Sequence, residues 1–273
     1  MSSTSEVRSV AVEGGSIRIH VRRAVGRSGI PLVLANGIGA SIEVLQPFVD
    51  ALPADVEVVR FDAPGAGGSP RPTWPYRMPG LARQVRTALD ELGYDEVDML
   101  GVSWGGGLAQ QFARTTGDRC RRLVLVSTGT GALMIPGSPR VLRLMTTPRR
   151  YRDAAYAQRI AGTIYGGAMR DGPDRAAHPL GDQANRVGTN MGYWMQLMAM
   201  AGWTSLPWLS RIRQPTLILA GDDDPIIPLA NARIMARLIP DARLHVYHDG
   251  HLALVTNPGA LAPVIVDFLR ASE

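Results

Sequence analysis

This chain of 273 residues has no lysine, one cysteine and no long apolar run. The single cysteine, Cys120, excludes an internal disulfide and is compatible with a reducing compartment. No apolar stretch approaches the roughly 20 residues that a helix needs to cross a bilayer. Residues 1–6 carry no signal pattern of basic and then apolar residues. We therefore expect a soluble, cytoplasmic protein without a transmembrane segment.

Patterns that would hold cofactors or nucleic acid are absent as well. The sequence has no H-x-E or C-x-x-C pairing, so we expect no metal and no organic cofactor. All 29 basic residues are arginines, mostly scattered among acidic residues, so the net charge of +5 does not indicate a nucleic-acid partner. The turn Pro64–Ser69 is rich in glycine like a phosphate loop, but no lysine follows it. We interpret it as a structural turn capped by Asp62.

Short apolar runs alternate with helical patterns along most of the chain. This alternation is typical of a mainly parallel, doubly wound α/β sheet with helices on both faces. From residue 129 to 209 the pattern is mostly helical instead, which is too long for a simple loop. We therefore predict a core of residues 1–130 and 210–273, and a helical lid at 131–209 inserted after the sixth main strand. Strands are expected at 7–12, 17–21, 31–35, 56–61, 96–102, 122–126, 215–220 and 243–247, and helices at 42–52, 80–92, 106–114, 230–238 and 261–269.

The pentapeptide Gly101–Gly105 has the pattern G-x-S-x-G, with Ser103 at its centre. It follows an apolar strand pattern and precedes a helical one, which is the context of a nucleophile elbow. The flanking glycines allow a tight turn that holds the serine in a strained backbone conformation. Because the turn leads into a helix N-terminus, negative charge that develops there would be stabilised. We therefore predict that Ser103 is a nucleophile.

A serine nucleophile needs a general base, and the sequence offers two candidates. His251 follows Gly250 directly after the last expected strand, where a loop can bring its ring across to Ser103. We favour His251 as the base, and His248 is the alternative.

The base in turn needs an orienting carboxylate. The aspartates at 222–224 follow the strand 215–220, and acids at the carboxyl end of a strand lie where α/β sites assemble. Asp224 is favoured because Pro225 fixes the chain behind it. Asp222 and Asp223 are expected to solvate the loop or cap a turn.

An oxyanion at the nucleophile needs two backbone N–H donors. We expect one from Trp104, which follows the nucleophile, and one from Ile38 in the glycine-flanked turn after strand 31–35. An apolar substrate is also indicated, since residues 191–200 contain four methionines and methionine adapts to flexible alkyl chains. We predict substrate contacts from Met195, Met198 and Trp203, although the same run can equally form the core of the lid.

A family resemblance is carried by the stretches Asn36–Ala40, Gly101–Gly106, Pro148–Tyr151, Thr163–Gly167, Gly202–Ser205 and Gln214–Leu217 with Gly221–Pro225. These stretches closely resemble the intracellular medium-chain-length polyhydroxyalkanoate depolymerases. The wider α/β-hydrolase pattern covers nearly the whole chain, from Val7 to Leu269. Asn36, in place of the histidine that many esterases carry there, also fits the depolymerases. The order of Ser103, Asp224 and His251 along the chain matches that of the α/β-hydrolases.

The resemblance implies an α/β-hydrolase fold and a triad of Ser103, Asp224 and His251. It implies hydrolysis of ester bonds in stored polyesters of 3-hydroxy acids with medium side chains, through an acyl-enzyme, at the surface of a cytoplasmic granule. Composition and spacing alone indicate only a serine ester hydrolase. The resemblance implies that its partner is a polyester granule or a hydrophobic ester substrate. The alternatives are a small-molecule carboxylesterase or carbon–carbon-bond hydrolase, a cofactor-free perhydrolase (haloperoxidase), and an inactive granule-binding protein.

Overall fold

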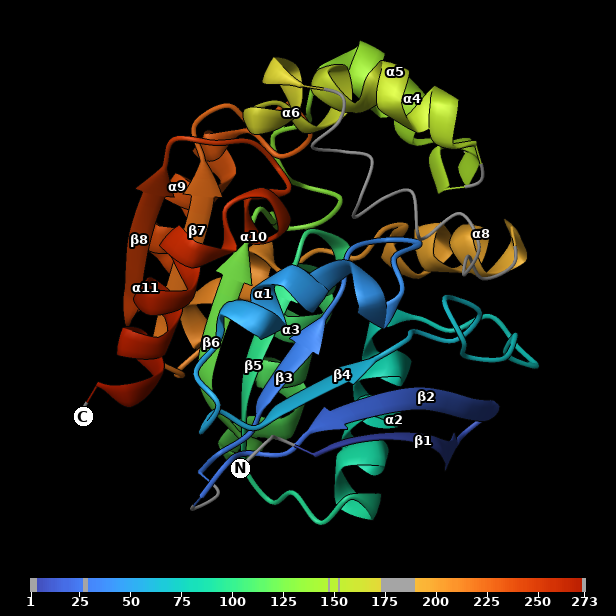
Figure 1. Cartoon of the computed structure of the whole chain (residues 1–273), viewed down its shortest axis with the longest axis vertical. Helices are drawn as coiled ribbons and strands as arrows, with labels where there is room; N and C mark the ends of the chain where they lie inside the picture. The colour runs from blue at the N-terminus through green and yellow to red at the C-terminus, as the bar shows by residue number, and fades with distance from the viewer. Residues whose placement is uncertain (1–3, 27–28, 147, 152, 173–189, 272–273) are drawn as a thin grey trace.

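The computed structural model describes residues 4–26, 29–146, 148–151, 153–172 and 190–271. In this part of the chain eight strands form one sheet in the order β1-β2-β4-β3-β5-β6-β7-β8 (Figure 1). Neighbouring strands from β4 to β8 are parallel, and β2 pairs antiparallel with both β1 and β4. The strands are β1 (Ser5–Val12), β2 (Gly15–Arg22), β3 (Leu32–Ala35), β4 (Val58–Phe61), β5 (Val97–Val102), β6 (Cys120–Val126), β7 (Thr216–Gly221) and β8 (Ala242–Tyr247).

Helices cover both faces of this sheet. The strands β3, β4, β5 and β7 are buried along their whole length, as parallel strands with two covered faces must be. This confirms the mainly parallel, doubly wound α/β sheet predicted from the sequence. One face packs on α2 (Met78–Glu91), α3 (Trp104–Thr116) and α9 (Leu229–Leu238), and the other packs on α1 (Gln46–Ala51), α10 (Ala253–Thr256) and α11 (Pro258–Arg270).

Most expected elements lie within a few residues of the observed ones. One expected helix is divided in two, and one observed helix was not expected. The expected helix 42–52 is a 3-10 turn, η1 (Ile42–Leu45), followed by α1. The break falls at Pro47, which has no N–H to donate to a continuous helix and favours a helix start. The short helix α10 was not expected, because Pro258 begins the next helix only two residues after its end.

Between β6 and β7 the chain leaves the sheet, in the region predicted as a lid. We call the described part of this region, residues 131–146, 148–151, 153–172 and 190–209, the insert segment; the prediction for 147, 152 and 173–189 lies outside the described residues. In Figure 1, α4 to α6 lie at the top, beyond the carboxyl ends of the strands, and α8 lies beside the segment that joins β4 to α2. Its elements are α4 (Pro139–Met145), η3 (Pro148–Tyr151), α5 (Ala154–Tyr165), α6 (Ala168–Asp171), α8 (Asn190–Met200) and the start of η5 (Leu206–Arg211).

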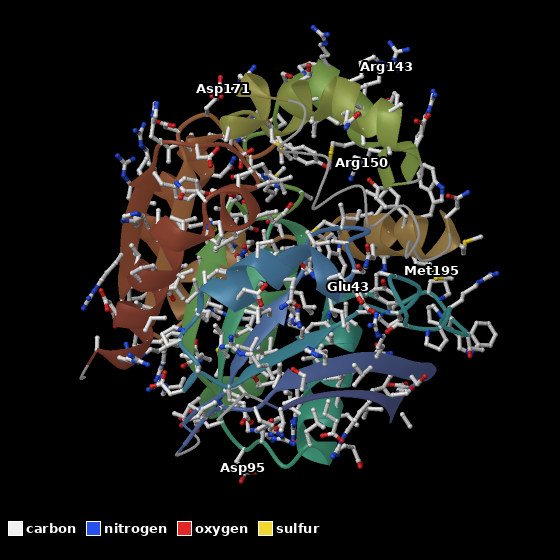
Figure 2. All side chains as sticks on the ribbon, viewed as in Figure 1. Glu43, Asp95, Arg143, Arg150, Asp171 and Met195 are labelled. Carbon is white, nitrogen blue, oxygen red and sulfur yellow. The ribbon has the colours of Figure 1, made fainter. Side chains whose placement is uncertain are left out.

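A small apolar cluster holds the upper helices of the insert segment together. Val141 of α4 and Ile164 of α5 pack in it with Ile226, which follows β7. Arg140 and Arg143 on the other side of α4 are exposed, and Arg143 extends into solvent at the top of Figure 2. In the described ranges, no helix is both long enough and apolar enough to cross a membrane.

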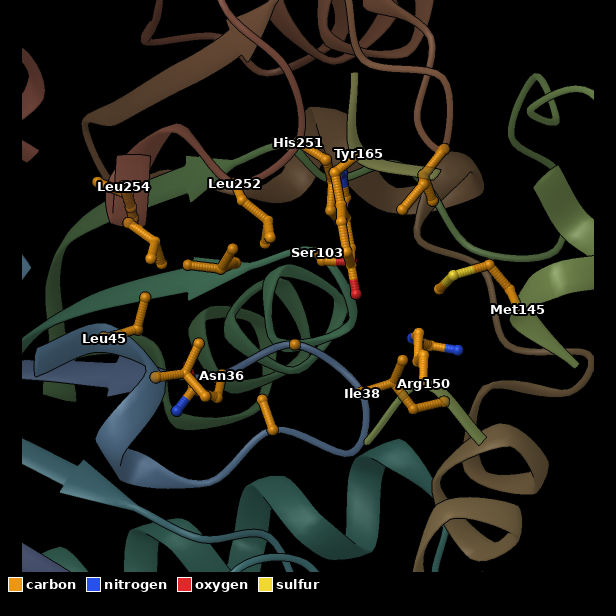
Figure 3. Close-up of a pocket in the computed structure, with 16 residues that line it drawn as sticks. Asn36, Ile38, Leu45, Ser103, Met145, Arg150, Tyr165, His251, Leu252 and Leu254 are labelled. Carbon is orange, nitrogen blue, oxygen red and sulfur yellow. The ribbon is translucent and has the colours of Figure 1, made fainter. Parts of the chain in front are cut away.

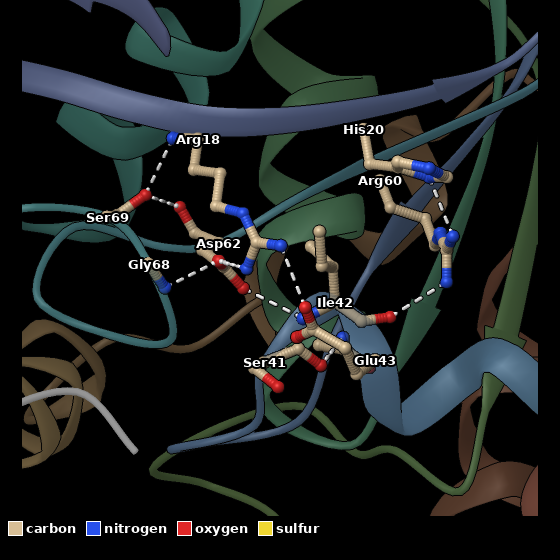
Figure 4. A network of polar contacts seen from close by, with 10 residues as sticks. Arg18, His20, Ser41, Ile42, Glu43, Arg60, Asp62, Gly68 and Ser69 are labelled. Atoms are coloured by element: carbon tan, nitrogen blue, oxygen red, sulfur yellow. Dashed lines mark hydrogen bonds and ion pairs between the residues drawn. The ribbon is translucent and has the colours of Figure 1, made fainter. Parts of the chain in front are cut away.

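A buried aspartate organises the glycine-rich turn that resembles a phosphate loop (Figure 4). The carboxylate of Asp62 accepts hydrogen bonds from the backbone N–H groups of Gly68 and Ile42, both at 2.8 Å. Arg18 lies 3.2 Å from this carboxylate and 2.8 Å from that of Glu43. Burial raises the pKa of the Asp62 carboxyl. Burial also acts to raise the pKa of Glu43, but the hydrogen bond from Arg18 helps to lower the pKa of Glu43 to about 2. The capping role predicted for Asp62 is confirmed, and it also ties the turn to the start of η1.

Replacement of Asp62 by alanine would leave two backbone N–H groups and Arg18 without this acceptor. We expect Asp62→Ala to lower the free energy of unfolding by about 3 kcal/mol, the usual cost of breaking a buried charged pair. Asp62→Asn keeps one carbonyl acceptor and should cost about half as much. Urea denaturation followed by tryptophan fluorescence measures both. Asp55→Ala, which removes an exposed pair with Arg270, is the control, and an equal loss in that variant would contradict the role of Asp62.

Candidate active site

Ser103 stands at the sharp turn between β5 and α3. Its φ of 55° and ψ of −119° lie outside the regions that residues with a Cβ favour. Among the described residues, Ser127, directly after β6, is the only other non-glycine residue with a positive φ. The strained backbone predicted for Ser103 is therefore confirmed, and such strain persists only where the surroundings impose it. The role of Ser103 as a nucleophile stays a prediction.

Two glycines allow this turn to pack against the sheet. A Cβ on Gly101 would overlap the carbonyl group of Gly105, and a Cβ on Gly105 would overlap the carbonyl oxygen of Ala35 at the end of β3. On the other side, the hydroxyl of Thr128 donates to the carbonyl oxygen of Ser103 at 2.7 Å. The turn is thus held between the ends of β3 and β6.

His251 and Asp224 form a buried pair from the loops that follow β8 and β7. Nδ1 of His251 lies 2.7 Å from Oδ2 of Asp224, and the two side chains are 5% and 1% exposed. The other carboxylate oxygen, Oδ1, accepts hydrogen bonds from the N–H groups of Ile226 and Ile227, both at 2.9 Å. The turn after Asp224 therefore orients the carboxylate and leaves one oxygen for the histidine.

Ser103 and His251 line the same pocket, which we call the inner pocket (Figure 3). Its walls are mostly apolar and come from η1, α10 and the insert segment, with Leu45 and Leu254 among them. The ring of Tyr165 stacks on that of His251, with centroids 6.4 Å apart and planes inclined by 18°. The general base that we predict is therefore sheltered from solvent by the insert segment.

A second pocket, the outer pocket, borders Ser103 on its other side. Leu197 and Met200 of α8 line it together with the residues at 128–134. Because Ala132 and Gly202 on its lining are exposed, the outer pocket reaches the surface of the protein. Ser103 thus lies where an enclosed apolar pocket meets an open one.

The predicted oxyanion donors lie on two elements beside Ser103. A Cβ on Gly37 would stand 3.7 Å from the Cβ of Ser103, and Ile38 lines both pockets. The side-chain amide of Asn36 donates to the carbonyl oxygen of Ser41 at 2.8 Å, which closes this turn. Trp104 begins α3, and the first N–H groups of a helix have no partner within it. Both residues lie beside Ser103, and their role as oxyanion donors stays a prediction.

The three predicted substrate contacts are not among the residues that line the two pockets. Met195 is buried in the core, Met198 is 56% exposed, and Trp203 packs beside α3. Within the described part of the chain none of them lines the inner or the outer pocket; Leu197 and Met200 do so instead. The role of these three residues as substrate contacts stays a prediction. Adjacent side chains on a helix point in different directions, so the composition of the run could not select its pocket-facing side.

A second histidine–aspartate pair has the same spacing in a different environment. Nδ1 of His248 lies 2.7 Å from Oδ2 of Asp222, but the His248 side chain is 98% exposed. The hydrogen bond with Asp222 raises the pKa of His248. His248 lines neither pocket at Ser103, so the geometry favours His251 over this alternative.

Asp223 anchors the insert segment. This role differs from the prediction that Asp223 solvates its loop or caps a turn. Its carboxylate lies 2.7 Å from Nε of Arg170 and accepts a hydrogen bond from the N–H of Gly167 at 2.7 Å. Next to it, Asp249 accepts a hydrogen bond from the N–H of Ala168 at 2.8 Å. The start of α6 is therefore fixed to the loops that carry the predicted acid and base.

Two residues of the inner pocket, Tyr165 and Arg150, were not selected from the sequence. Tyr165 precedes the pair Gly166 and Gly167, both with positive φ, and this pair is a signal that could have marked a close contact. Arg150 is buried and donates to the hydroxyl of Tyr193 at 3.1 Å; its stretch, Pro148–Tyr151, carries part of the family resemblance, but no local pattern assigns it to the pocket. In the ranges that the structure describes, no cluster of three or more His, Cys, Asp or Glu residues could hold a metal ion.

Comparisons with known proteins agree with this geometry. The family described by the alpha/beta hydrolase fold matches residues 30–258. The chain is 51% identical over 266 residues to a poly(3-hydroxyalkanoate) depolymerase from Ectopseudomonas oleovorans, with 96% of this chain and 92% of that protein covered. The family resemblance predicted from the sequence is confirmed by these two matches.

Solved structures show the same fold. A hydrolase from Pseudomonas aeruginosa PA01 matches with a TM-score of 0.80 and 25% identity, with 97% of this chain and 99% of that chain covered. An enol-lactonase from Burkholderia xenovorans LB400 matches with a TM-score of 0.81 and 24% identity, with 97% and 100% covered.

The two histidine–aspartate pairs provide a matched test of the predicted base. An active-serine phosphonate should label Ser103, and His251→Ala should slow the labelling by about 10³-fold because the hydroxyl loses its proton acceptor. His248→Ala should leave the rate within about twofold, since an exposed pair far from the serine cannot take its proton. Mass spectrometry of the labelled peptide measures both rates. Equal loss in the two variants would contradict the assignment of His251.

Proposed function

Because the chain belongs to the α/β-hydrolase family, we propose that it is a serine hydrolase that cleaves the ester bonds of polyhydroxyalkanoate. The observation that carries this proposal is a strained Ser103 that shares a pocket with His251, which is itself paired with the buried Asp224. The relative that is 51% identical, a poly(3-hydroxyalkanoate) depolymerase, supports the polyester as the substrate.

The reaction proceeds in two steps of acyl transfer. Oγ of Ser103 attacks the ester carbonyl while His251 takes the proton of the hydroxyl, and Asp224 holds the imidazole in position. The backbone N–H groups of Ile38 and Trp104 stabilise the oxyanion of the tetrahedral intermediate. His251 then protonates the leaving alcohol, which leaves an acyl-enzyme on the serine. Water activated by His251 hydrolyses this ester and releases a 3-hydroxy acid or an oligomer.

The two pockets at the serine suit different parts of a polyester with alkyl side chains. The inner pocket is enclosed and apolar, so it accepts the flexible side chain of the acyl unit but not a continuing polymer chain. The outer pocket reaches the surface, so the polymer chain extends through it. This division supports an alkyl side chain on the acyl unit, because the walls of the inner pocket are mostly apolar.

An exposed apolar surface beside α8 supports contact with an intracellular polymer granule. Met191, Trp194 and Met198 are three and four residues apart and therefore share one side of the helix, and all three are exposed. Trp74, in the segment before α2, is 75% exposed. Arg77 in the same segment donates to the carbonyl oxygen of Ala201 at 2.9 Å, which holds the segment beside α8. Exposed apolar patches of this kind mark interaction surfaces, and we call these four residues the apolar surface.

Hydrolysis of granules tests the proposal directly. Wild type should release 3-hydroxy acids from amorphous granules of medium-side-chain polyhydroxyalkanoate. Ser103→Ala should release them at least about 10³-fold more slowly, because no acyl-enzyme can form. Chromatography of the released acids measures both rates.

Two further arms separate the parts of the proposal. Granules of poly(3-hydroxybutyrate), with methyl side chains, should be cleaved about tenfold more slowly, since the inner pocket gains less contact. A wild type that cleaves soluble p-nitrophenyl esters but releases nothing from either polymer would overturn the depolymerase proposal. Release by Ser103→Ala at the wild-type rate would overturn the mechanism.

The apolar surface gives a separate prediction. The double variant Trp74→Gln/Trp194→Gln should bind granules about tenfold more weakly, because it exposes less apolar area to the polymer. Co-sedimentation with granules measures the binding, and hydrolysis of a soluble ester checks that the site is intact. Leu238→Gln replaces an exposed leucine of α9, outside this surface, and should bind like wild type. Equal binding by the double variant and wild type would contradict the role of the apolar surface in granule binding.

A further inference from the structure

Gln196 is a buried amide in the middle of the apolar helix α8. It is 1% exposed, and it has no part in the chemistry proposed above. A buried amide is costly unless its polar atoms are hydrogen-bonded. Its partners therefore indicate why a glutamine stands at this position.

These partners belong to the two turns that carry the predicted oxyanion donors. Oε1 of Gln196 accepts a hydrogen bond from the N–H of Gly39 at 2.6 Å. Gly39 directly follows Ile38 in the sequence. The carbonyl oxygen of Gln196 accepts a hydrogen bond from Nε1 of Trp104 at 2.9 Å. One residue of the insert segment thus contacts both turns.

The helix α8 is itself fixed to the segment that joins β4 to α2. Gln196 forms a hydrogen bond with the hydroxyl of Tyr76, which opposes the rise that burial causes in the pKa of this tyrosine. The hydroxyl of Tyr76 also lies 3.3 Å from the carbonyl oxygen of Pro64, to which it donates. A Cβ on Gly192 would overlap the carbonyl oxygen of Gly65, so the two backbones are in direct contact. The anchor that Gln196 offers to the two turns is therefore rigid.

We propose that Gln196 is a positioning residue that holds the Ile38 and Trp104 N–H groups at the separation an oxyanion requires. This rests on the serine hydrolase mechanism proposed above. The bond to Gly39 fixes the peptide plane that follows Ile38, at a glycine whose φ of 71° belongs to the left-handed region. Oxyanion donors act only when they point to where the charge develops. Gln196 lines neither pocket in the described residues, so its loss lowers kcat and leaves substrate binding unchanged.

The test is a set of variants assayed on a soluble p-nitrophenyl ester. Gln196→Leu keeps the size of the side chain and removes the acceptor, so we expect kcat to fall about 30-fold with KM within about twofold. Gln196→Glu keeps an acceptor for the Gly39 N–H and should recover kcat to within about fivefold of wild type. Amide hydrogen exchange at residues 37–39 should be faster in Gln196→Leu, which reports on the turn without any catalysis.

Gln84→Leu is the matched control for the loss of a buried glutamine. Gln84 lies in α2 and donates to the carbonyl oxygen of Glu13 at 2.6 Å, and Glu13 belongs to neither turn. We expect this variant to lose a similar amount of thermal stability and to keep the wild-type kcat.

Three results would overturn the proposal: a wild-type kcat in Gln196→Leu, an equal loss of kcat in Gln84→Leu, or no recovery in Gln196→Glu. Failure of the depolymerase proposal is distinct from all three. It would appear as a wild type that leaves polymer intact and still cleaves the soluble ester on which these variants are compared.

Discussion

The site depends on contacts in which two backbones meet with no side chain between them. The turn at Ser103 exists because Gly105 lies directly against Ala35 at the end of β3. The loop before His251 meets the insert segment in the same way, since a Cβ on Gly250 would overlap the carbonyl oxygen of Tyr165. Main-chain atoms have little freedom to adjust. These contacts therefore set the positions of the serine and the histidine before any side-chain hydrogen bond is considered.

Burial, and not spacing, separates the two histidine–aspartate pairs. Both have the same separation of 2.7 Å between nitrogen and oxygen. In the pair of His248 and Asp222, solvent competes for both partners, so the contact holds neither ring nor carboxylate in one orientation. In the pair of His251 and Asp224, the stacked ring of Tyr165 and the turn after Asp224 exclude water and leave one arrangement. The insert segment thus turns an ordinary histidine–aspartate contact into an oriented one.

The parts of the site that could be predicted from the sequence are those that a local pattern encodes. The turn of Ser103 is a pentapeptide between a strand and a helix, and Asp224 and His251 each follow a strand whose end the fold places at one edge of the sheet. Gln196 and Arg150 could not be predicted in this way. Their partners lie far away in the sequence, at Gly39 and Tyr193, and no spacing rule joins such pairs. A mostly helical insert was predicted around Gln196, but the bounds and the orientation of α8 are set by packing that composition does not record.

The insert segment is held to the site from two sides, and this limits how a polymer can reach the serine. Displacement of α8 would leave the N–H of Gly39 and the indole N–H of Trp104 without acceptors, at about 1–3 kcal/mol each. Displacement of α6 would break the pair of Arg170 and Asp223 together with the backbone bond to Asp249. Entry through the outer pocket breaks none of these contacts, because it already reaches the surface at Gly202. In the mechanism that we propose, a chain that enters there reaches the serine while the turns of Ile38 and Trp104 keep their contacts with α8. Substrate access then does not require α8 to move.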